Sequence, residues 1–372
     1  MEPRFRVLVT MRSWRTSLAS AGYANLLDAQ PRVAEVVDVS DHYPLDEAHM
    51  CRVIAEHGPF HACLVGDDTL SAAVIDALAD RVRADPYPHV GIHKCGVGHN
   101  DIDKAAAKRR GVPVSITRRP ELSPNQDAVA ELTVALVLAT LRHIVPLRGA
   151  LEAGDWDTRP LGRDLIGLCL GLVGLGAVGR EVARRLLSWG VRIAAYDPVA
   201  VDLESYVRAY NAEGDRDILG RRGSTMTAFA SLDAMLPECD VVSIHTPLTE
   251  VTAGMVNAEF LQKMKARAVL INPSRGGLVV EEDLVAAYQR HDLGGLAVDV
   301  LIREFGQAQA APPPLLELLQ AGAPIIITPH VGSLTEQTMP RQLDWMQRNA
   351  LASLGLLDGP VHMWLAEAAA PW

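Results

Sequence analysis

A glycine-rich hexapeptide narrows the possible folds of this 372-residue chain more than any other segment. It reads Gly174-Leu175-Gly176-Ala177-Val178-Gly179, and it lies between the apolar run 168–173 and a helical pattern over 179–189. In the pattern G-x-G-x-x-G, the first glycine permits a tight turn and the second lets the backbone approach a diphosphate. The third lets helix and strand pack closely, and the N–H groups that begin the helix bind the negative charge. A strand before and a helix after the motif predict a dinucleotide site.

Asp197 closes the next predicted strand, 192–196. A carboxylate at that place accepts hydrogen bonds from the adenosine ribose hydroxyls and repels a 2′-phosphate, which favours NAD over NADP. The alternative is a glycine-rich turn followed by an unrelated surface aspartate.

Short apolar runs alternate with helical patterns along the whole chain, which is typical of an α/β layer with a mainly parallel sheet. Helices are predicted over 18–27 and 70–84, and a long apolar helix over 127–145. The predicted strands are 5–10, 33–39, 62–66, 89–92 and 112–116, then 168–173, 192–196, 241–245, 268–271, 295–300 and 325–328. The last six are enough for a complete doubly wound sheet. The polar segment 199–227 is predicted to be a loop-rich insertion near the adenosine end.

Charge and cysteine content exclude several classes of protein. The chain has 35 Lys and Arg against 45 Asp and Glu, a formal charge of −10, which argues against nucleic acid or an anionic membrane as the main partner. The five cysteines include no C-x-x-C pair and no spacing typical of zinc, so we expect no metal. Reduced cysteines and the lack of an apolar leader predict a soluble, cytoplasmic protein.

Three polar residues come shortly after predicted strands of the second half. Arg275 follows the strand 268–271, Glu304 comes five residues after Asp299, and His330 follows the last strand. In an open α/β sheet the carboxyl ends of the strands face the ligand. Taken singly, these residues could be a surface ion pair, a solvated carboxylate and a capping histidine, but their coincidence downstream of a dinucleotide turn favours a shared active site.

These residue types suit the interconversion of a hydroxy acid and a keto acid. An arginine fork binds a carboxylate through paired hydrogen bonds. A histidine takes and returns the hydroxyl proton near neutral pH, and a nearby glutamate stabilises its imidazolium form.

From about Val90 to Ser333 the chain resembles the NAD-dependent D-2-hydroxyacid dehydrogenases. The segments that carry the resemblance are 96–103 (GVGHNDID), 129–132 (VAEL), the glycine-rich turn, 242–249 (VSIHTPLT), 272–277 (NPSRGG), 298–300 (VDV) and 328–330 (TPH).

The resemblance implies roles for individual residues. Arg275, Glu304 and His330 match the catalytic arginine, glutamate and histidine of the family. The positions that match cofactor contacts are Gly174, Gly176, Ala177, Val178, Gly179, Asp197, Thr246, Pro273, Ser274, Asp299 and Gly332.

The resemblance also implies a domain organisation. It predicts two Rossmann-like domains with doubly wound parallel sheets and an active site in the cleft between them. Residues 1–118 with 333–372 would form a flavodoxin-like substrate-binding domain, and residues 119–332 the NAD-binding domain. The long helix over 127–145 would help to form a homodimer.

The loop after the strand 89–92 is the predicted substrate contact of the first domain. Gly96, Val97 and Gly98 can offer backbone N–H groups to a carboxylate, and Lys94 can contact a second acidic group. The alternative for Lys94 is a surface lysine beside a structural turn.

Two acidic residues argue against a phosphorylated substrate. Asp67 and Asp68 stand where phosphoglycerate enzymes typically have an arginine, and they would repel a phosphate. They could instead bind a hydroxyl or an amine, or cap the helix that begins near Leu70.

We therefore expect an NAD-dependent oxidoreductase acting on a small D-2-hydroxy acid and its 2-keto acid. Two alternatives stay open at this point. One is a phosphite or phosphonate dehydrogenase of the same fold, and the other is a non-catalytic NAD-sensing protein resembling the C-terminal binding protein corepressors.

Overall fold

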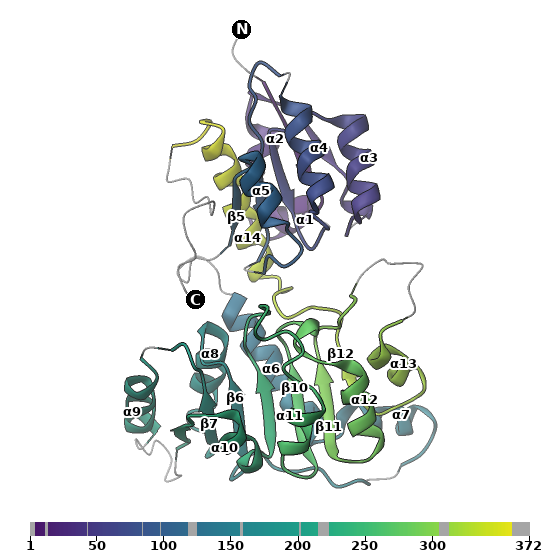
Figure 1. Ribbon diagram of the computed structural model, residues 1–372, viewed down its shortest axis with the longest axis vertical. Coiled ribbons are helices and arrows are strands. Elements are labelled where there is room, and N and C mark those ends of the chain that lie inside the picture. Colours follow the sequence, from purple (N-terminus) through teal and green to yellow (C-terminus); the bar gives the residue numbers. More distant parts are fainter. Residues whose placement is uncertain are drawn as a thin grey trace. The chain divides into compact units, whose positions relative to one another are not determined.

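The computed structural model describes residues 4–11, 14–42, 44–83, 85–96, 98–117, 125–156, 159–200, 202–214, 223–304 and 312–358. The chain divides into two compact units. Unit 1 is assigned Met1–Asn125, Phe305–Ala308 and Ser333–Trp372, and unit 2 is assigned Gln126–Glu304 and Gln309–Gly332. Each unit is an α/β layer on a parallel sheet (Figure 1). The predicted α/β class with two parallel sheets is confirmed.

The sheet of unit 1 has five parallel strands in the order β2-β1-β3-β4-β5. They are β1 (Phe5–Val9), β2 (Val33–Asp38), β3 (Ala62–Val65), β4 (Gly91–Lys94) and β5 (Val114–Ile116). The order reverses direction between β1 and β3, which is the point where sheets of this type bind their ligands, beyond the carboxyl ends of the strands.

Helices cover both faces of this sheet because its strands are apolar on both sides. One face packs against α3 (Glu47–His57), α4 (Ala72–Val82) and α5 (Lys104–Arg110). The other packs against α1 (Trp14–Ser20), α2 (Leu26–Ala29) and α14 (Thr338–Ser353), and η1 (Ser40–His42) follows β2. Helix α14, yellow in Figure 1, thus returns from the end of the chain to complete the core of unit 1.

The sheet of unit 2 has seven parallel strands in the order β12-β11-β10-β9-β6-β7-β8. They are β6 (Cys169–Val173), β7 (Arg192–Tyr196), β8 (Thr225–Ala228), β9 (Val241–Ile244), β10 (Ala268–Asn272), β11 (Leu293–Val298) and β12 (Ile326–Ile327). The order reverses between β6 and β9, so the turn after β6 lies at the switch point.

Two hydrophobic cores, one on each face, hold this sheet. Helices α6 (Asn125–Leu141), α8 (Ala177–Arg185) and α9 (Leu203–Gly214) cover one face. Helices α10 (Leu232–Met235), α11 (Ala258–Lys263), α12 (Glu281–Gln289) and α13 (Pro314–Gln320) cover the other. The short helices η2 (Leu236–Glu238) and η3 (Gly276–Leu278) lie in loops, and α7 (Ile144–Glu152) follows α6.

The interpretation of 199–227 as a loop-rich insertion is wrong, because this segment contains α9 and the beginning of the edge strand β8. Leu203, Tyr206, Val207 and Tyr210 recur at helical spacing and pack in the core beside α8, and the Tyr210 hydroxyl donates to the carbonyl of Ala183 at 3.0 Å. An apolar stripe among many polar residues was enough to specify the helix.

Two predicted helices are also corrected. The segment 18–27 is not one helix, because Gly22 takes a left-handed conformation (φ 74°) and Asn25 caps a new helix. The long helix over 127–145 ends at Leu141, where the chain bends by 59° into α7. In the described part of the chain no single helix has the length and apolar composition needed to cross a bilayer, and α6 with α7 meets that criterion only as this bent pair.

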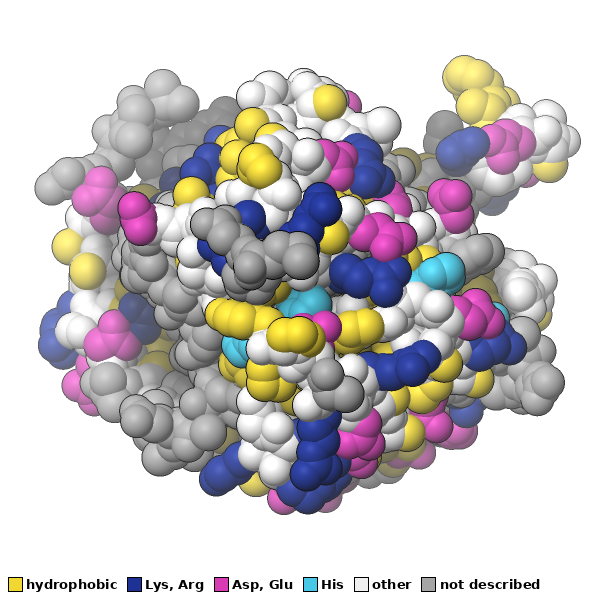
Figure 2. Space-filling model, turned by 90° about the horizontal axis from the view of Figure 1, so that it is seen from above, with side chains coloured by type: hydrophobic (Ala, Val, Ile, Leu, Met, Phe, Trp, Pro, Cys, Tyr) yellow, Lys and Arg dark blue, Asp and Glu magenta, His cyan; other side chains and the backbone are white. Residues whose placement is uncertain are grey.

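Charged side chains of both signs are interspersed over the face seen in Figure 2. Exposed ion pairs contribute little individually to stability.

Candidate functional site

The glycine-rich turn has the backbone that its sequence predicts. Gly174 has φ 99°, and a Cβ at this position would lie 2.8 Å from the carbonyl carbon of His245, at the end of β9. A Cβ on Gly179 would lie 2.3 Å from the carbonyl oxygen of Gly174. Both positions therefore need glycine, the first for its φ and close approach and the second for contact between helix and turn.

The N-terminus of α8 is open and suits a diphosphate. Gly176 is its N-cap, no side chain caps the helix, and a Cβ on Gly176 would meet no atom within 4 Å. Ala177 is exposed and Val178 half-buried. The backbone N–H groups of a first helical turn have no partner within the helix, so they bind anions. The described residues thus fit the cofactor that the sequence predicts.

Asp197 lies beside this turn. Its Oδ2 accepts from the N–H of Leu175 at 2.9 Å, and its Oδ1 accepts from the N–H groups of Val199 and Ala200 at 3.0 and 3.1 Å. Each carboxylate oxygen has two acceptor sites, so these contacts leave capacity for a ribose hydroxyl.

The loops after β9 and β10 are tied together next to the turn. The Ser274 hydroxyl donates to the carbonyl of Thr246 at 2.6 Å. Asn272, buried at the end of β10, accepts from the N–H of Ser274 at 3.1 Å and donates to the carbonyl of Arg275 at 2.9 Å. Asn272 fixes the backbone of Arg275, and the sequence reasoning did not single it out, although an amide within an apolar strand was a signal.

Arg275 is half-buried, and its Nη1 donates to the carbonyl of Ser274 at 2.6 Å. Its guanidinium has five N–H donors, so most of them remain for a ligand.

Glu304 and His330 form a direct pair. Oε2 of Glu304 lies 2.6 Å from Nδ1 of His330, and Oε1 of Glu304 accepts from the N–H of Leu301 at 3.2 Å. The two side chains are 20% and 23% exposed, so solvent reaches the pair only in part. His330 takes a left-handed backbone conformation, φ 52°, which is uncommon for a residue with a Cβ and which His143, Arg267 and His291 also adopt.

Asp299 holds the loop that carries His330. It is buried, and it accepts from the Thr328 hydroxyl at 2.5 Å and from the N–H groups of Val331 and Gly332 at 2.9 and 2.8 Å. Burial raises the pKa of the Asp299 carboxyl, and these three hydrogen bonds oppose that change.

The sheet order brings the predicted catalytic residues to one edge. Strand β11, which precedes Asp299 and Glu304, lies between β10, which precedes Arg275, and β12, which precedes His330. The carboxyl ends of parallel neighbours meet at the same edge, so all three loops share it.

Lys94, the predicted substrate contact in unit 1, is not a surface lysine. Its side chain is 2% exposed, and its Nζ lies 2.8 Å from Asp101 Oδ2, 3.2 Å from Asp67 Oδ1 and 2.5 Å from the carbonyl of Gly66. Burial lowers the pKa of Lys94, but Asp101 and Asp67 outweigh it and raise the pKa above its usual value. The lysine is charged, and its charge is compensated within the unit.

Asp67 and Asp68 have separate tasks. Asp67 pairs with Lys94, whereas Asp68 is buried and accepts from the Thr10 hydroxyl and from the N–H groups of Leu45 and Gly66 at 2.8 and 3.0 Å. Asp68 therefore joins the ends of β1 and β3 at the switch point of unit 1. Neither caps α4, whose N-cap is Ser71.

The rest of the predicted substrate loop is partly described. Gly96 has φ 84° and open space around its Cβ position, and its carbonyl accepts from the N–H of Thr117 at 3.0 Å. Gly98 is half-buried, and Val97 lies outside the described residues.

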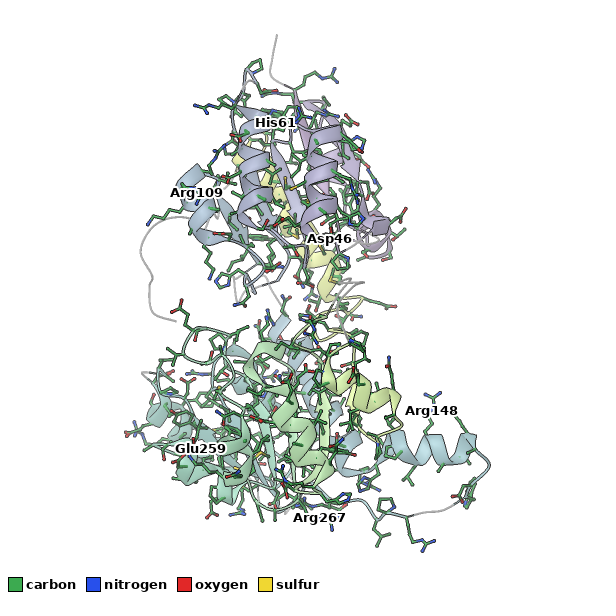
Figure 3. The ribbon with its side chains drawn as sticks, turned by 45° about the vertical axis from the view of Figure 1, so that its right-hand side comes forward. Asp46, His61, Arg109, Arg148, Glu259 and Arg267 are labelled. Atoms are coloured by element: carbon green, nitrogen blue, oxygen red, sulfur yellow. The ribbon has the colours of Figure 1, made fainter. Side chains whose placement is uncertain are left out.

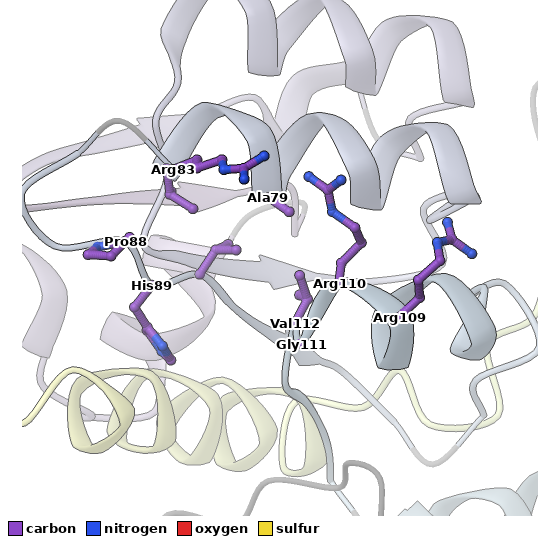
Figure 4. Close-up of a pocket in the computed structure, with 10 residues that line it drawn as sticks. Ala79, Arg83, Pro88, His89, Arg109, Arg110, Gly111 and Val112 are labelled. Atoms are coloured by element: carbon purple, nitrogen blue, oxygen red, sulfur yellow. The ribbon is translucent and has the colours of Figure 1, made fainter.

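A pocket of about 390 Å³ lies elsewhere in unit 1 (Figure 4). Residues that line it precede β4 and β5, so it is at the amino edge of the sheet rather than the ligand-binding edge. Arg109 and Arg110, at the C-terminal end of α5, pair with Asp76 and Asp80 of α4. Arginines at helix C-termini have an ordinary stabilising role.

No group of three His, Cys, Asp or Glu side chains placed to hold a metal ion occurs among the residues that the structure covers. The cysteines that are described are free. Burial raises the pKa of Cys95 to about 12, which keeps this thiol protonated and unreactive.

Comparison with known proteins adds four findings. The family model described as D-isomer specific 2-hydroxyacid dehydrogenase, NAD binding domain, matches residues 134–332. A glyoxylate reductase of Thermofilum pendens is 34% identical over 86% of this chain and 85% of its own length. A D-3-phosphoglycerate dehydrogenase of Synechocystis is 34% identical over 66% of this chain and 39% of its own length. A solved structure from Polaromonas, a D-isomer specific 2-hydroxyacid dehydrogenase by its description, shares the fold with TM-score 0.73 at 22% identity, over 97% of this chain and all of that one.

Proposed function

Because this chain belongs to the D-isomer specific 2-hydroxyacid dehydrogenase family and is an NAD-dependent oxidoreductase, we propose that it interconverts a small D-2-hydroxy acid and its 2-keto acid. The observation that carries the proposal is the Glu304–His330 pair, 2.6 Å apart, at the same sheet edge as Arg275 and the dinucleotide turn.

His330 is the acid and base of the proposed reaction. The bound nicotinamide supplies or accepts the hydride. When a keto acid is reduced, Nε2 of His330 gives a proton to the oxygen that becomes the hydroxyl, and in the reverse direction it takes that proton back. Nδ1 faces Glu304, which fixes the orientation of the ring and stabilises the imidazolium form.

Arg275 binds the substrate carboxylate in this proposal. The fixed backbone on both sides of Arg275 supports that role, because Asn272 holds the loop and leaves the guanidinium to the ligand. A planar fork matches a carboxylate through two parallel hydrogen bonds. The N–H groups around Gly96, Val97 and Gly98 are the proposed second contact with the acid.

The two units have different tasks in the proposal. Unit 2 is the NAD-binding domain, since the family model for that domain matches residues 134–332, and unit 1 is the substrate-binding domain. The cofactor positions are those predicted from the sequence, with Asp197 selecting NAD over NADP. Asp299 acts on the cofactor side mainly by holding the loop of His330 and Gly332.

A homodimer completes the proposal. None of the residues of α7 is buried in the protomer, and this helix extends from the body of unit 2 with Arg148 projecting from it (Figure 3). Ile144, Leu151 and Trp156 are 54%, 53% and 83% exposed. Apolar side chains gathered on a protruding element are typical of a protein interface, and a second copy is the occupant we expect. Light scattering on the purified protein tests this: a monomer mass at micromolar concentration contradicts it.

The two alternatives left open by the sequence are not favoured. The curated relatives reported above are named as a reductase and a dehydrogenase, which argues against a non-catalytic sensor and against phosphite or phosphonate as the substrate. The cytoplasmic location stays a prediction.

A panel of 2-keto acids with NADH tests the proposal. Glyoxylate, hydroxypyruvate, pyruvate and bulkier keto acids are mixed with the purified protein, and NADH absorbance is followed. We expect turnover with at least one of them and a loss of about 10²-fold or more in kcat/KM for His330→Ala and for Arg275→Ala. Tight NADH binding without turnover of any acid, or near-normal turnover by folded His330→Ala, contradicts the proposal.

A further inference from the structure

Two adjacent peptide groups, Val300–Leu301 and Leu301–Ile302, link Glu281 to two parts of the candidate active site. Against the second lies Gly276, next to Arg275, where a Cβ would be 2.0 Å from the carbonyl of Leu301. The N–H of Leu301, in the preceding peptide group, donates to Glu304 Oε1 at 3.2 Å. The N–H of Ile302 donates to Oε1 of Glu281 at 2.8 Å.

Glu281 is a buried carboxylate for which the reaction itself gives no use. It is 1% exposed and is the first residue of α12. Its second oxygen, Oε2, accepts from the N–H of Leu315 at 3.2 Å, in the first turn of α13. One carboxylate therefore holds the backbone before and after Glu304 in the sequence.

We propose that Glu281 is a positioning residue, which sets the distance between Glu304 and His330 by holding the Leu301–Ile302 peptide. This inference rests on the proposed function, since it assigns Glu281 to the support of the same acid–base pair. The two peptide groups share the Cα of Leu301. If Glu281 releases the Leu301–Ile302 peptide, the N–H of Leu301 moves with it, and Glu304 loses its hydrogen-bonded orientation toward Nδ1 of His330.

Because the Glu281 carboxylate is buried, it depends on its two backbone hydrogen bonds. Burial raises the pKa of the Glu281 carboxyl, and the hydrogen bonds from Ile302 and Leu315 favour its ionised form. A buried carboxylate is costly unless hydrogen bonds satisfy it, so both N–H groups are strongly held. A simpler role for Glu281 is that of an acidic residue in the first turn of α12, where its negative charge interacts favourably with the helix dipole and stabilises the helix.

A control variant at Glu282 distinguishes the positioning role of Glu281 from simple stabilisation of the helix end. Glu282 is adjacent in the same helical turn, it carries the same charge, and it is exposed. Glu281→Gln and Glu282→Gln therefore change the helix-end charge equally, but only the first replaces an acceptor that faces a backbone N–H with an amide donor.

The experiment measures steady-state reduction of the best keto acid by wild type, both single variants, Glu304→Gln and the double variant Glu281→Gln/Glu304→Gln. We expect Glu281→Gln to lower kcat by about 10–100-fold with little change in the KM for the keto acid, because proton transfer and not carboxylate binding is disturbed. Glu282→Gln should stay within about twofold of wild type. In the Glu304→Gln background, Glu281→Gln should lower kcat almost no further, because the carboxylate that Glu281 positions is already absent.

Three outcomes overturn the inference. The first is an equal fall of kcat in Glu281→Gln and Glu282→Gln. The second is that Glu281→Gln lowers kcat as much in the Glu304→Gln background as it does in the wild type. The third is that Glu281→Gln changes only the KM for the keto acid. Absence of keto-acid turnover by the wild type would instead reject the proposed function. If thermal melting shows Glu281→Gln to be unfolded, Glu281→Asp, which keeps the charge but shortens the reach, is carried through the same cycle with the same expected results.

Discussion

Nδ1 of His330 lies 2.6 Å from Oε2 of Glu304, although 26 residues separate them in the sequence. Asp299 holds the histidine loop through the N–H groups of Val331 and Gly332, and the N–H of Leu301 orients the glutamate. The pair is thus fixed by backbone contacts on both sides before any ligand binds.

Glu304→Gln should shift the pH dependence of keto-acid reduction. The carboxylate stabilises the imidazolium form of His330, and reduction needs that form. Without the charge, the histidine loses its proton at lower pH, so the decline of kcat on the alkaline side moves to lower pH and the maximal kcat falls by roughly 10-fold or more. Stopped-flow or steady-state pH profiles measure this. The exposed Glu317→Gln is the control, and an unmoved alkaline limb in folded Glu304→Gln would contradict the role of the pair.

Local patterns were enough to predict the parts of the site that short segments encode. Gly174 needs glycine for its positive φ, and Gly179 for its contact with the carbonyl of Gly174, so both requirements arise within one hexapeptide. The strands before the catalytic loops are mostly apolar. Because parallel strands end at one edge, the order of the strands then brings the residues that follow them to the same edge. This is why Arg275, Glu304 and His330 could be singled out before their contacts were known.

Other features depend on partners that no local pattern contains. The burial of Lys94 results from Asp67 and Asp101, which come from a different strand end and from the following loop. Helix α9 was missed because its polar residues outnumber the apolar stripe that binds it to the core. Glu281 looks like an ordinary first-turn acid until its contacts with Ile302 and Leu315 are seen.

Asp67→Asn should make the enzyme more tolerant of a phosphorylated substrate. In the wild type the charge of Lys94 is compensated by the carboxylates of Asp67 and Asp101, so Lys94 offers little free positive charge to a phosphate at this edge. Removal of one carboxylate frees part of that charge and removes a repulsion. We expect the ratio of kcat/KM for phosphohydroxypyruvate to that for hydroxypyruvate to rise by about 10-fold.

A ratio of two substrates cancels any common effect on stability or cofactor binding. Asp76→Asn is the matched control, since Asp76 also pairs with a cation, Arg109, but does so between helices α4 and α5 of the same unit. An equal change of the ratio in both variants, or no change in Asp67→Asn, would reject a role of Asp67 in specificity.

Asp197→Asn should relax the choice between NADH and NADPH. The wild-type carboxylate faces the turn and would meet the 2′-phosphate of NADPH as a like charge, so we expect a preference for NADH of about 10²-fold in kcat/KM. Asparagine keeps an oxygen that can accept from the N–H of Leu175 but removes the charge. The preference should fall most of the way to unity, while Asp233→Asn, an exposed aspartate paired with Lys263, should leave it unchanged. An undiminished preference in Asp197→Asn would mean that another group selects the cofactor.

Acid should destabilise unit 1 through a buried histidine, His93. This side chain lies on β4 under α14, with Nδ1 2.8 Å from the Ser115 hydroxyl and 3.2 Å from Nδ2 of Asn349. Burial lowers the pKa of His93 to about 3, against 6.5 for an unperturbed histidine. Between these values the unfolded chain binds a proton that the folded chain does not, so the stability that neutral His93 confers is complete above pH 6.5 and is lost as the pH falls toward 3.

His93→Gln isolates this contribution from that of the buried carboxyls, which the variant leaves in place. Denaturant unfolding at a series of pH values should show the free energy of unfolding of the wild type falling more steeply with acid than that of the variant. The difference in slope should approach about 1.4 kcal/mol per pH unit below pH 6. The half-exposed His57→Gln should not change the slope. Parallel curves for wild type and His93→Gln would show that His93 is protonated in the folded protein and that its burial does not carry the acid sensitivity.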